Sequence, residues 1–209
     1  MARINNYEIQ LRQAQARFLE YDQQALIHKL KLQADENFLY VTLLCKAYRL
    51  CRRTGSLQRL DETWVDANTH GEVMTLLDLI CDSRPDRHLS GNLVNMSEFG
   101  LRFHQVLLES RDPFAEAIQA DPEGFRRACL ALEGKAYPGG DMAYSMELFE
   151  GLRIAVLFWE GDEEFPARVR YLWDANALMY LKYETMYFAL GILRSRILGR
   201  MREEPPASS

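Results

Sequence analysis

The chain has 209 residues, and its content of 48% hydrophobic, 11% aromatic and 26% charged residues is typical of a globular protein, not of a disordered or fibrous one. Its 25 basic and 30 acidic residues give a net charge of −5, which provides no general attraction to nucleic acid or anionic lipid. No apolar stretch approaches the roughly 20 residues of a membrane-spanning helix, and the N-terminus has no apolar signal segment. We therefore expect a cytoplasmic protein with no nucleic-acid partner and no membrane partner.

Helix and hairpin patterns fill the first third of the chain. Apolar residues recur at helical spacing over residues 5–34, with an interruption near Tyr21, and Asp22 is placed to cap a second helix. Residues 38–45 are rich in β-branched and aromatic side chains, and residues 48–53 lead through Thr54 and Gly55 into residues 56–60. Gly55 lies between the last two segments and takes a positive φ at no steric cost, so we predict a β-hairpin here.

The central region contains several helix starts and one loop. Thr69 and Glu72 have the spacing of a capping box, which predicts a helix over residues 69–82. Residues 83–91 contain Pro, Ser and Gly and are expected to form an ordered loop. Further helices are predicted from Ser97 to residue 108, from Asp112 to residue 120 and from Asp121 to residue 133.

The last third predicts a sheet followed by a helix. Strand patterns over residues 142–149, 152–159 and 168–173 are joined by tight turns, which indicates an antiparallel meander. A helical pattern begins at Ala175, and its apolar residues within 178–198 would form a homodimer interface if the chain itself leaves them uncovered. We expect a single α+β domain over residues 1–202 and a polar tail at residues 203–209.

The cysteines and histidines show no metal-binding pattern. Cys45, Cys51, Cys81 and Cys129 lie in apolar surroundings and lack the spacing of a zinc or iron–sulfur motif. No pair of histidines has the spacing of metal ligands on one helix. We expect buried thiols, and no zinc or iron–sulfur cofactor bound by this chain.

The loop at residues 83–91 is a candidate ligand site. Guanidinium, imidazole and hydroxyl groups close together in sequence are able to grip a carboxylate or a phosphate. The alternative is that the serines and the aspartate bond only to nearby backbone groups while the arginines lie in solvent. The candidate residues are Ser83, Arg84, Asp86, Arg87, His88 and Ser90.

Acidic residues gather near the turn at residues 160–166. Clustered carboxylates suit a divalent cation or general acid and base chemistry. The alternative is a solvated turn whose charges keep the sheet edge from pairing with another chain. The candidate residues are Asp141, Glu160, Asp162, Glu163, Glu164 and Asp174.

Four arginines lie on the predicted hairpin, at positions 49, 52, 53 and 59. They could contact phosphate, but on an acidic chain a solvated strand face is the expected use of such residues. We find no phosphate-binding glycine loop, nucleophile elbow or His-Glu-x-x-His motif, so the common nucleotide-binding and hydrolase signatures are absent from the sequence.

Several motifs occur in a fixed order: Tyr48 to Leu60 as a Tyr-x-x-x-Arg-x-Thr-Gly hairpin, Ser83-Arg-Pro-Asp with Leu89-Ser-Gly91, Gly139-Gly-Asp141, and Asp-Glu-Glu-Phe-Pro at residues 162–166 before Trp173-Asp174. Together they resemble the bacterial and archaeal family called domain of unknown function 3786, over about residues 7–198. The resemblance implies no assigned activity. Some relatives are joined to an iron–sulfur segment of the kind found in corrinoid one-carbon proteins, and this sequence lacks the cysteine-rich stretch that such a segment needs.

Three hypotheses follow. The first is that the protein binds a small polar or anionic ligand between the loop at 83–91 and the acidic turn at 160–166, where polar loops at a sheet end form a pocket. The second is a metal-assisted hydrolase that uses Asp141, Asp162, Glu164 and Asp174. The third is an interaction module without chemistry that forms a homodimer through residues 178–198.

Overall fold

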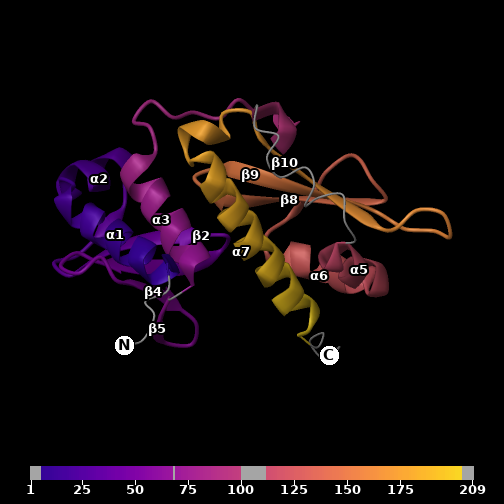
Figure 1. Ribbon diagram of the computed structural model, residues 1–209, viewed down its shortest axis with the longest axis horizontal. Helices are drawn as coiled ribbons and strands as arrows, with labels where there is room; N and C mark the ends of the chain where they lie inside the picture. Colours follow the sequence, from indigo (N-terminus) through magenta and orange to yellow (C-terminus); the bar gives the residue numbers. More distant parts are fainter. Residues whose placement is uncertain (1–5, 68, 100–111, 204–209) are drawn as a thin grey trace. The chain divides into compact units, whose positions relative to one another are not determined.

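The computed structural model describes residues 6–67, 69–99 and 112–203. The chain divides into two compact units: unit 1 comprises Met1–His88 and Leu178–Ile192, and unit 2 comprises Leu89–Ala177 and Leu193–Ser209. Each unit contains one five-stranded antiparallel sheet together with helices, which confirms the predicted α+β class (Figure 1).

Two helices open unit 1, with the break at the predicted place. Helix α1 (Asn6–Glu20) is followed by α2 (Gln23–Leu30). The side chain of Asp22 accepts hydrogen bonds from the N–H groups of Gln24 and Ala25, which satisfies donors that the first turn of a helix leaves unpaired. Asp22 is therefore the N-cap of α2, as its position in the sequence predicts.

The sheet of unit 1 is a simple meander. Side chains alternate along its long strands, so Leu39 and Val41 are buried on one face while Phe38 and Tyr40 are half-buried on the other. The strands follow one another in space as they do in sequence: β1 (Gln33–Ala34), β2 (Phe38–Leu43), β3 (Lys46–Cys51), β4 (Leu57–Leu60) and β5 (Trp64–Asp66).

Two sequence expectations are wrong in this sheet. Leu44 and Cys45 make a tight turn with φ values of 49° and 59° that joins β2 to β3. The turn carries Cys45 into solvent, so this thiol is exposed rather than buried, whereas Cys81 and Cys129 are buried as expected. Residues 33–34 form the short strand β1 instead of ending a helix, since they pair with β2.

Helix α3 (His70–Asp82) is hydrogen-bonded to strands β3 and β4 of this sheet through Glu72. Its N-cap is Thr69, whose hydroxyl accepts the N–H of Glu72 at 3.3 Å, as the capping pattern predicts. The Glu72 carboxylate is only 5% exposed, and it accepts hydrogen bonds from the Tyr48 hydroxyl at 2.7 Å and Arg59 Nη1 at 2.9 Å. A buried charge is thus paired and hydrogen-bonded on several sides.

Gly55 lies in the turn between β3 and β4, where its φ of 69° confirms the predicted glycine conformation. A Cβ at this position would lie 2.8 Å from the backbone oxygen of Gln15 in α1. We expect Gly55→Ala to lower the free energy of unfolding by about 1–3 kcal/mol, because it adds this clash to the left-handed backbone strain. Urea titration followed by circular dichroism measures the change.

The control for this prediction is Gly191→Ala in the last helix, where no atom lies within 4 Å of the added Cβ. Alanine is favoured over glycine inside a helix, so this variant should gain about 0.5–1 kcal/mol. Equal effects at the two glycines would contradict the assignment of strain to Gly55.

In unit 2 the predicted meander is confirmed and extended. Strands β8 (Met142–Phe149), β9 (Leu152–Trp159) and β10 (Arg168–Asp174) pair in sequence order, and two short strands that the sequence did not predict, β6 (Leu93–Asn95) and β7 (Lys135–Ala136), complete the sheet. The 3-10 helix η1 (Met96–Phe99) follows β6. The predicted helix from Ser97 to residue 108 falls largely on residues 100–111, which lie outside the described part of the chain.

Helices α5 (Pro113–Ala120) and α6 (Pro122–Ala131) pack on one face of this sheet (Figure 1). Asp112 and Asp121 cap them, each followed by a proline at the first helical position, as predicted. The Phe125 ring of α6 contacts the rings of Tyr144 and Phe158, with centroids 5.9 and 6.5 Å away. These contacts place the aromatic core of unit 2 between helix and sheet.

The last helix starts later than predicted. A 3-10 helix, η2 (Ala177–Met179), precedes α7 (Tyr183–Met201), so the helix does not begin at Ala175. The side chain of Asp78 in α3 accepts the N–H of Lys182 at 2.8 Å and pairs with its ammonium at 2.7 Å, which fixes the start of α7 within unit 1. Asp78 is separated from this start by 104 residues, so local patterns could not reveal it.

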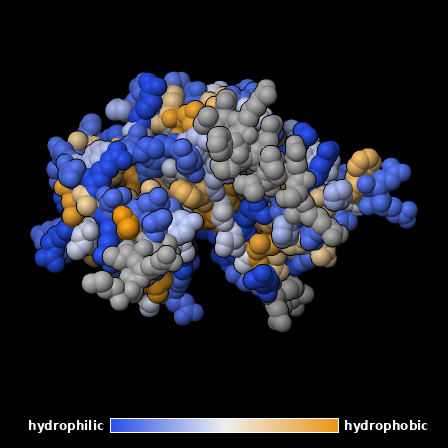
Figure 2. All heavy atoms as spheres, in the orientation of Figure 1, coloured by the Kyte–Doolittle hydropathy of each residue, from blue (hydrophilic) through white to orange (hydrophobic). Residues whose placement is uncertain are grey.

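Hydrophilic side chains predominate on the face shown in Figure 2, with apolar residues in small groups. Among the described residues, none of the helices has the length and apolar character required to cross a bilayer.

Candidate functional site

The polar residues of the loop at 83–88 bond mainly to one another and to nearby backbone. Arg84 donates two hydrogen bonds to Asp86, at 2.9 and 2.7 Å, and this pairing holds the pKa of the Asp86 carboxyl below its ordinary value. Arg87 donates to the backbone oxygens of Arg84 and Lys29, and the His88 ring lies 3.1 Å from the backbone oxygen of Asp86. The Ser83 side chain is buried. These contacts agree with the alternative reading of the loop, in which its polar side chains bond to neighbouring groups of the protein and not to a ligand.

Ser90 contacts one member of the acidic set, Asp174. The Asp174 carboxylate is 3% exposed and accepts hydrogen bonds from the Ser90 N–H and hydroxyl, both at 2.9 Å, from the Gly91 N–H at 3.0 Å and from the Asn176 N–H at 2.9 Å. Burial opposes its ionisation, but these donors outweigh burial and hold its pKa below the ordinary value. Asp174 therefore fastens the loop at 89–92 to the end of β10.

The other acidic residues shape the turn between β9 and β10. Asp162 accepts the N–H groups of Phe165 and Glu164, at 2.7 and 2.8 Å, and these bonds lower its pKa. Asp141 accepts the N–H of Glu160 at 2.8 Å. The side chains of Glu160, Glu163 and Glu164 are exposed.

The carboxylates of the hydrolase hypothesis do not come together. Within residues 6–67, 69–99 and 112–203, no three His, Cys, Asp or Glu side chains are close enough to hold a metal ion. Asp141, Asp162, Glu164 and Asp174 all fall in this part of the chain. Three of them are used as acceptors for backbone N–H groups, and the geometry lends no support to the hydrolase hypothesis.

The arginines of the hairpin make different contacts. Arg59 faces inward and pairs with Glu72 and Asp61. Arg49 lies on the outer face of the sheet between the rings of Phe38 and Trp64, 4.2 and 4.6 Å from their centroids. Arg49 and Arg59 therefore lie on opposite faces of the sheet, and these two guanidinium groups do not share one basic surface.

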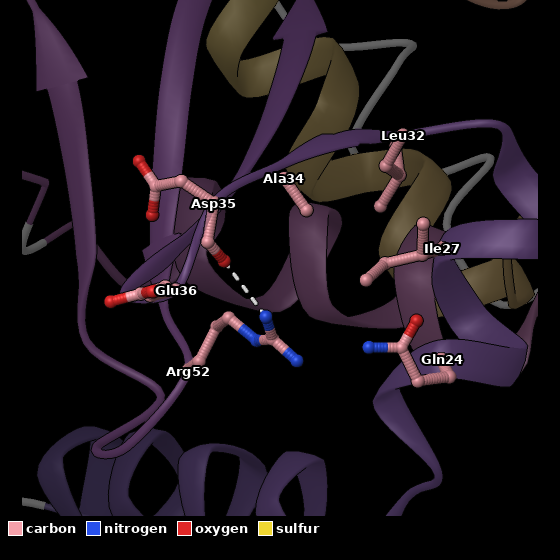
Figure 3. Close-up of a pocket in the computed structure, with 7 residues that line it drawn as sticks. All are labelled: Gln24, Ile27, Leu32, Ala34, Asp35, Glu36 and Arg52. Atoms are coloured by element: carbon pink, nitrogen blue, oxygen red, sulfur yellow. Dashed lines mark hydrogen bonds between the residues drawn. The ribbon is translucent and has the colours of Figure 1, made fainter.

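Arg52 lines a pocket of about 470 Å³ in unit 1 (Figure 3). This volume falls in the range of small-molecule sites in proteins. The pocket is formed by α2, the segment that contains β1, and the turn that follows β3. Its lining residues are Gln24, Ile27, Leu32, Ala34, Asp35, Glu36 and Arg52.

The Arg52 guanidinium is held in place by two hydrogen bonds. Nε donates to Gln23 Oε1 at 3.0 Å, and Nη1 donates to the backbone oxygen of Asp35 at 2.7 Å. The Gln23 amide in turn donates to the Arg52 backbone oxygen at 2.8 Å. Figure 3 shows the Arg52 guanidinium and the Gln24 carboxamide directed into the pocket, and the apolar side chain of Ile27 beside them.

The two carboxylates of the pocket rim point away from that space (Figure 3). The Asp35 carboxylate accepts hydrogen bonds from the Tyr40 hydroxyl at 2.6 Å and from the N–H groups of Asn37 and Phe38, both at 2.7 Å, and these bonds lower its pKa. Asp35 is therefore committed to the turn between β1 and β2. The interior of the pocket combines one cationic group, one amide and an apolar wall.

Sequence reasoning missed this pocket. The sequence places Arg52 among several basic residues of the hairpin and Gln24 and Ile27 in a helix, with no pattern that joins them. The available signal was the sequence Gln23-Gln24 directly after a helix cap, because two amides at a helix start are well placed to bond groups from another segment.

The fold and the pocket define an α+β protein with two antiparallel sheets and a small polar pocket beside the first. The chain matches the family described as a domain of unknown function, DUF3786, over residues 22–196, and it belongs to that family. This confirms the resemblance found in the sequence. No curated protein and no solved structure matches the chain.

Proposed function

We propose that this protein binds a small carboxylate with an apolar part in the pocket around Arg52. The observation that carries the proposal is the fixed Arg52 guanidinium, which is directed into a pocket that also has an amide and an aliphatic wall. A guanidinium held in place binds a carboxylate through paired, charge-assisted hydrogen bonds. Ile27 and Leu32 provide the surface for the apolar part of the ligand.

The sequence also suggested a small anionic ligand, but it suggested the loop at 83–91 and the turn at 160–166 as the site instead of the pocket around Arg52. Residues 83–88 and 160–166 belong to different units. The Arg84 guanidinium is already paired with the Asp86 carboxylate, whereas the two hydrogen bonds of Arg52 go to neutral oxygens and leave its charge for a ligand. Arg87 also bonds to neutral oxygens, but it does not line the pocket. The homodimer through residues 178–198 stays a prediction.

Arg52→Gln tests the proposal. Isothermal titration of the wild-type protein with acetate, isovalerate, N-acetylvaline and succinate, and with phosphate for comparison, should give saturable binding of the carboxylates that have an apolar part. Removal of the guanidinium should weaken this binding about tenfold or more, because a hydrogen bond to a charged group contributes roughly 1.5–3 kcal/mol. Unchanged affinity in the variant, or no saturable binding by any carboxylate, would contradict the proposal.

Two further variants serve as controls. Arg53→Gln makes the same charge change at an exposed neighbour outside the pocket lining and should leave the affinity within about twofold, since exposed charges are screened by salt. Glu36→Gln removes a like charge from the rim and should strengthen carboxylate binding at low salt. The thermal midpoint of each variant shows whether it is folded.

A further inference from the structure

The lining of the Arg52 pocket carries charges of both signs in different places. The guanidinium is directed into the pocket, and Asp35 and Glu36 lie at its rim (Figure 3). The hydrogen bond from the Tyr40 hydroxyl, together with those from two backbone N–H groups, holds the pKa of Asp35 below its ordinary value, so this carboxyl is ionised at neutral pH. The lining therefore has one positive and two negative charges, and a ligand with a carboxylate alone matches only the positive one.

Glu36 is the rim charge that is available to a ligand. Its side chain is exposed, and within residues 6–67, 69–99 and 112–203 no group forms a hydrogen bond or an ion pair with its carboxylate. A positive group on the same side of the pocket is attracted to this charge through space, and salt weakens the attraction. A second negative group on the ligand is repelled by both rim carboxylates.

The acidic rim and the apolar wall lie on different sides of the guanidinium. Figure 3 shows Asp35 and Glu36 on one side of Arg52, and it shows Ile27 and Leu32 on the other. A straight chain that runs from Arg52 along the wall carries its far end away from the rim. A carbon atom that bears a carboxylate, a positive group and an aliphatic side chain directs the three groups to three different places. The arrangement therefore favours a branched zwitterion.

From this arrangement we infer that the ligand is a free α-amino acid with an aliphatic side chain. The inference rests on the proposed function and names the class of carboxylate. The α-carboxylate binds Arg52 and the Gln24 amide, and the α-ammonium group lies on the side of the acidic rim. The aliphatic side chain packs on Ile27 and Leu32. Each part of the lining thus has its counterpart on one small molecule.

Isothermal titration of the full chain with valine and isovalerate tests this inference, because isovalerate is valine without its amino group. At low ionic strength the better-bound enantiomer of valine should bind about threefold or more tightly than isovalerate, and the difference should shrink in about 0.5 M NaCl. Valinamide has no carboxylate for Arg52 and should bind about tenfold or more weakly than valine. A ligand held at three places distinguishes mirror images, so the two enantiomers of valine should differ about fivefold or more in affinity.

Glu36→Gln gives a second arm, in which the two ligands should respond in opposite directions. Loss of the rim charge should weaken valine binding about twofold or more at low salt and should strengthen isovalerate binding. The matched control is Glu62→Gln, since Glu62 is an exposed glutamate of the same unit outside the pocket lining. This variant should leave both affinities within about 1.5-fold of the wild type.

The outcomes separate the inference from the proposed function. If isovalerate binds in an Arg52-dependent way and neither enantiomer of valine binds more tightly, the inference fails and the proposed function stands. Equal affinities of the two enantiomers also overturn the inference, as does a Glu36→Gln variant that changes the affinities for valine and isovalerate alike. If neither valine nor isovalerate binds, both fail.

Discussion

Replacing Glu72 with alanine should lower the free energy of unfolding of unit 1 by about 3–5 kcal/mol, the range found when one partner of a buried ion pair is removed. The carboxylate is 5% exposed, and the substitution leaves the buried Tyr48 hydroxyl without its acceptor and Arg59 without one of its two carboxylates. Hydrogen exchange of α3 and β3, measured against urea, gives a readout specific to unit 1.

The matched control is Glu62→Ala, because Glu62 is an exposed glutamate in the same unit. It should change stability by less than about 0.5 kcal/mol, as is usual for surface substitutions. Tyr48→Phe removes only one hydrogen bond to the buried carboxylate and should have an intermediate effect. Equal effects of Glu72→Ala and Glu62→Ala would contradict the assigned role of the network.

The same network predicts the direction of a pH dependence. Burial opposes ionisation of Glu72, but the hydrogen bonds from Thr69, Tyr48 and Arg59 outweigh it, so the pKa is lower in the folded protein than in the unfolded chain. A depressed folded pKa gives stability that is complete above the ordinary glutamate pKa, about 4.3, and is lost as the pH falls through the folded value. In Glu72→Ala this acid-dependent component should be absent.

The second large effect is expected at Asp174. Asp174→Ala removes the acceptor of the N–H groups of Ser90, Gly91 and Asn176, which should cost about 3 kcal/mol, since each of these three hydrogen bonds contributes roughly 1 kcal/mol. Asp174→Asn keeps one carbonyl oxygen as an acceptor and should lose less. Urea denaturation and hydrogen exchange of residues 89–95 measure both effects.

Asp141→Ala is the control for Asp174, since Asp141 is an exposed aspartate that accepts one backbone hydrogen bond in the same unit. Its loss should stay below about 1 kcal/mol. The pKa of Asp174 is also depressed, so its contribution should be complete above about pH 4 and disappear as the pH falls through the folded value. If Asp174→Ala retains full stability but loses ligand binding, the structural role assigned to this residue is wrong.

Elements with strong local chemistry were predictable from the sequence. The pairs Asp112-Pro113 and Asp121-Pro122 combine a capping oxygen with a fixed φ, and they start α5 and α6 as expected. The turn at Leu44 and Cys45 was not predictable, because it uses positive φ in residues that rarely take it. Strand β1 has two residues, and its existence depends on pairing with β2 rather than on its own sequence.

The site was less predictable than the fold for a related reason. Its chemistry comes from a residue after β3 and from residues of α2, and only the folding of unit 1 brings them together. The local motifs at residues 83–91 and 160–166 were visible because they are rich in polar residues. In the described structure, most of these polar side chains form hydrogen bonds within their own loop or turn, as Asp162 does with the N–H groups of Glu164 and Phe165.

The division of the chain between its units has a consequence for synthesis on the ribosome. Unit 1 takes residues from both sides of the segment Leu89–Ala177 of unit 2, since Leu178–Ile192 belongs to unit 1. The ring of Phe188 lies 4.9 Å from that of His70 at the start of α3, and Lys182 pairs with Asp78. The N-terminal half therefore cannot complete its packing during translation until almost the whole polypeptide has emerged. Unit 2 also takes a later segment, Leu193–Ser209, so neither unit is complete before α7 has been made.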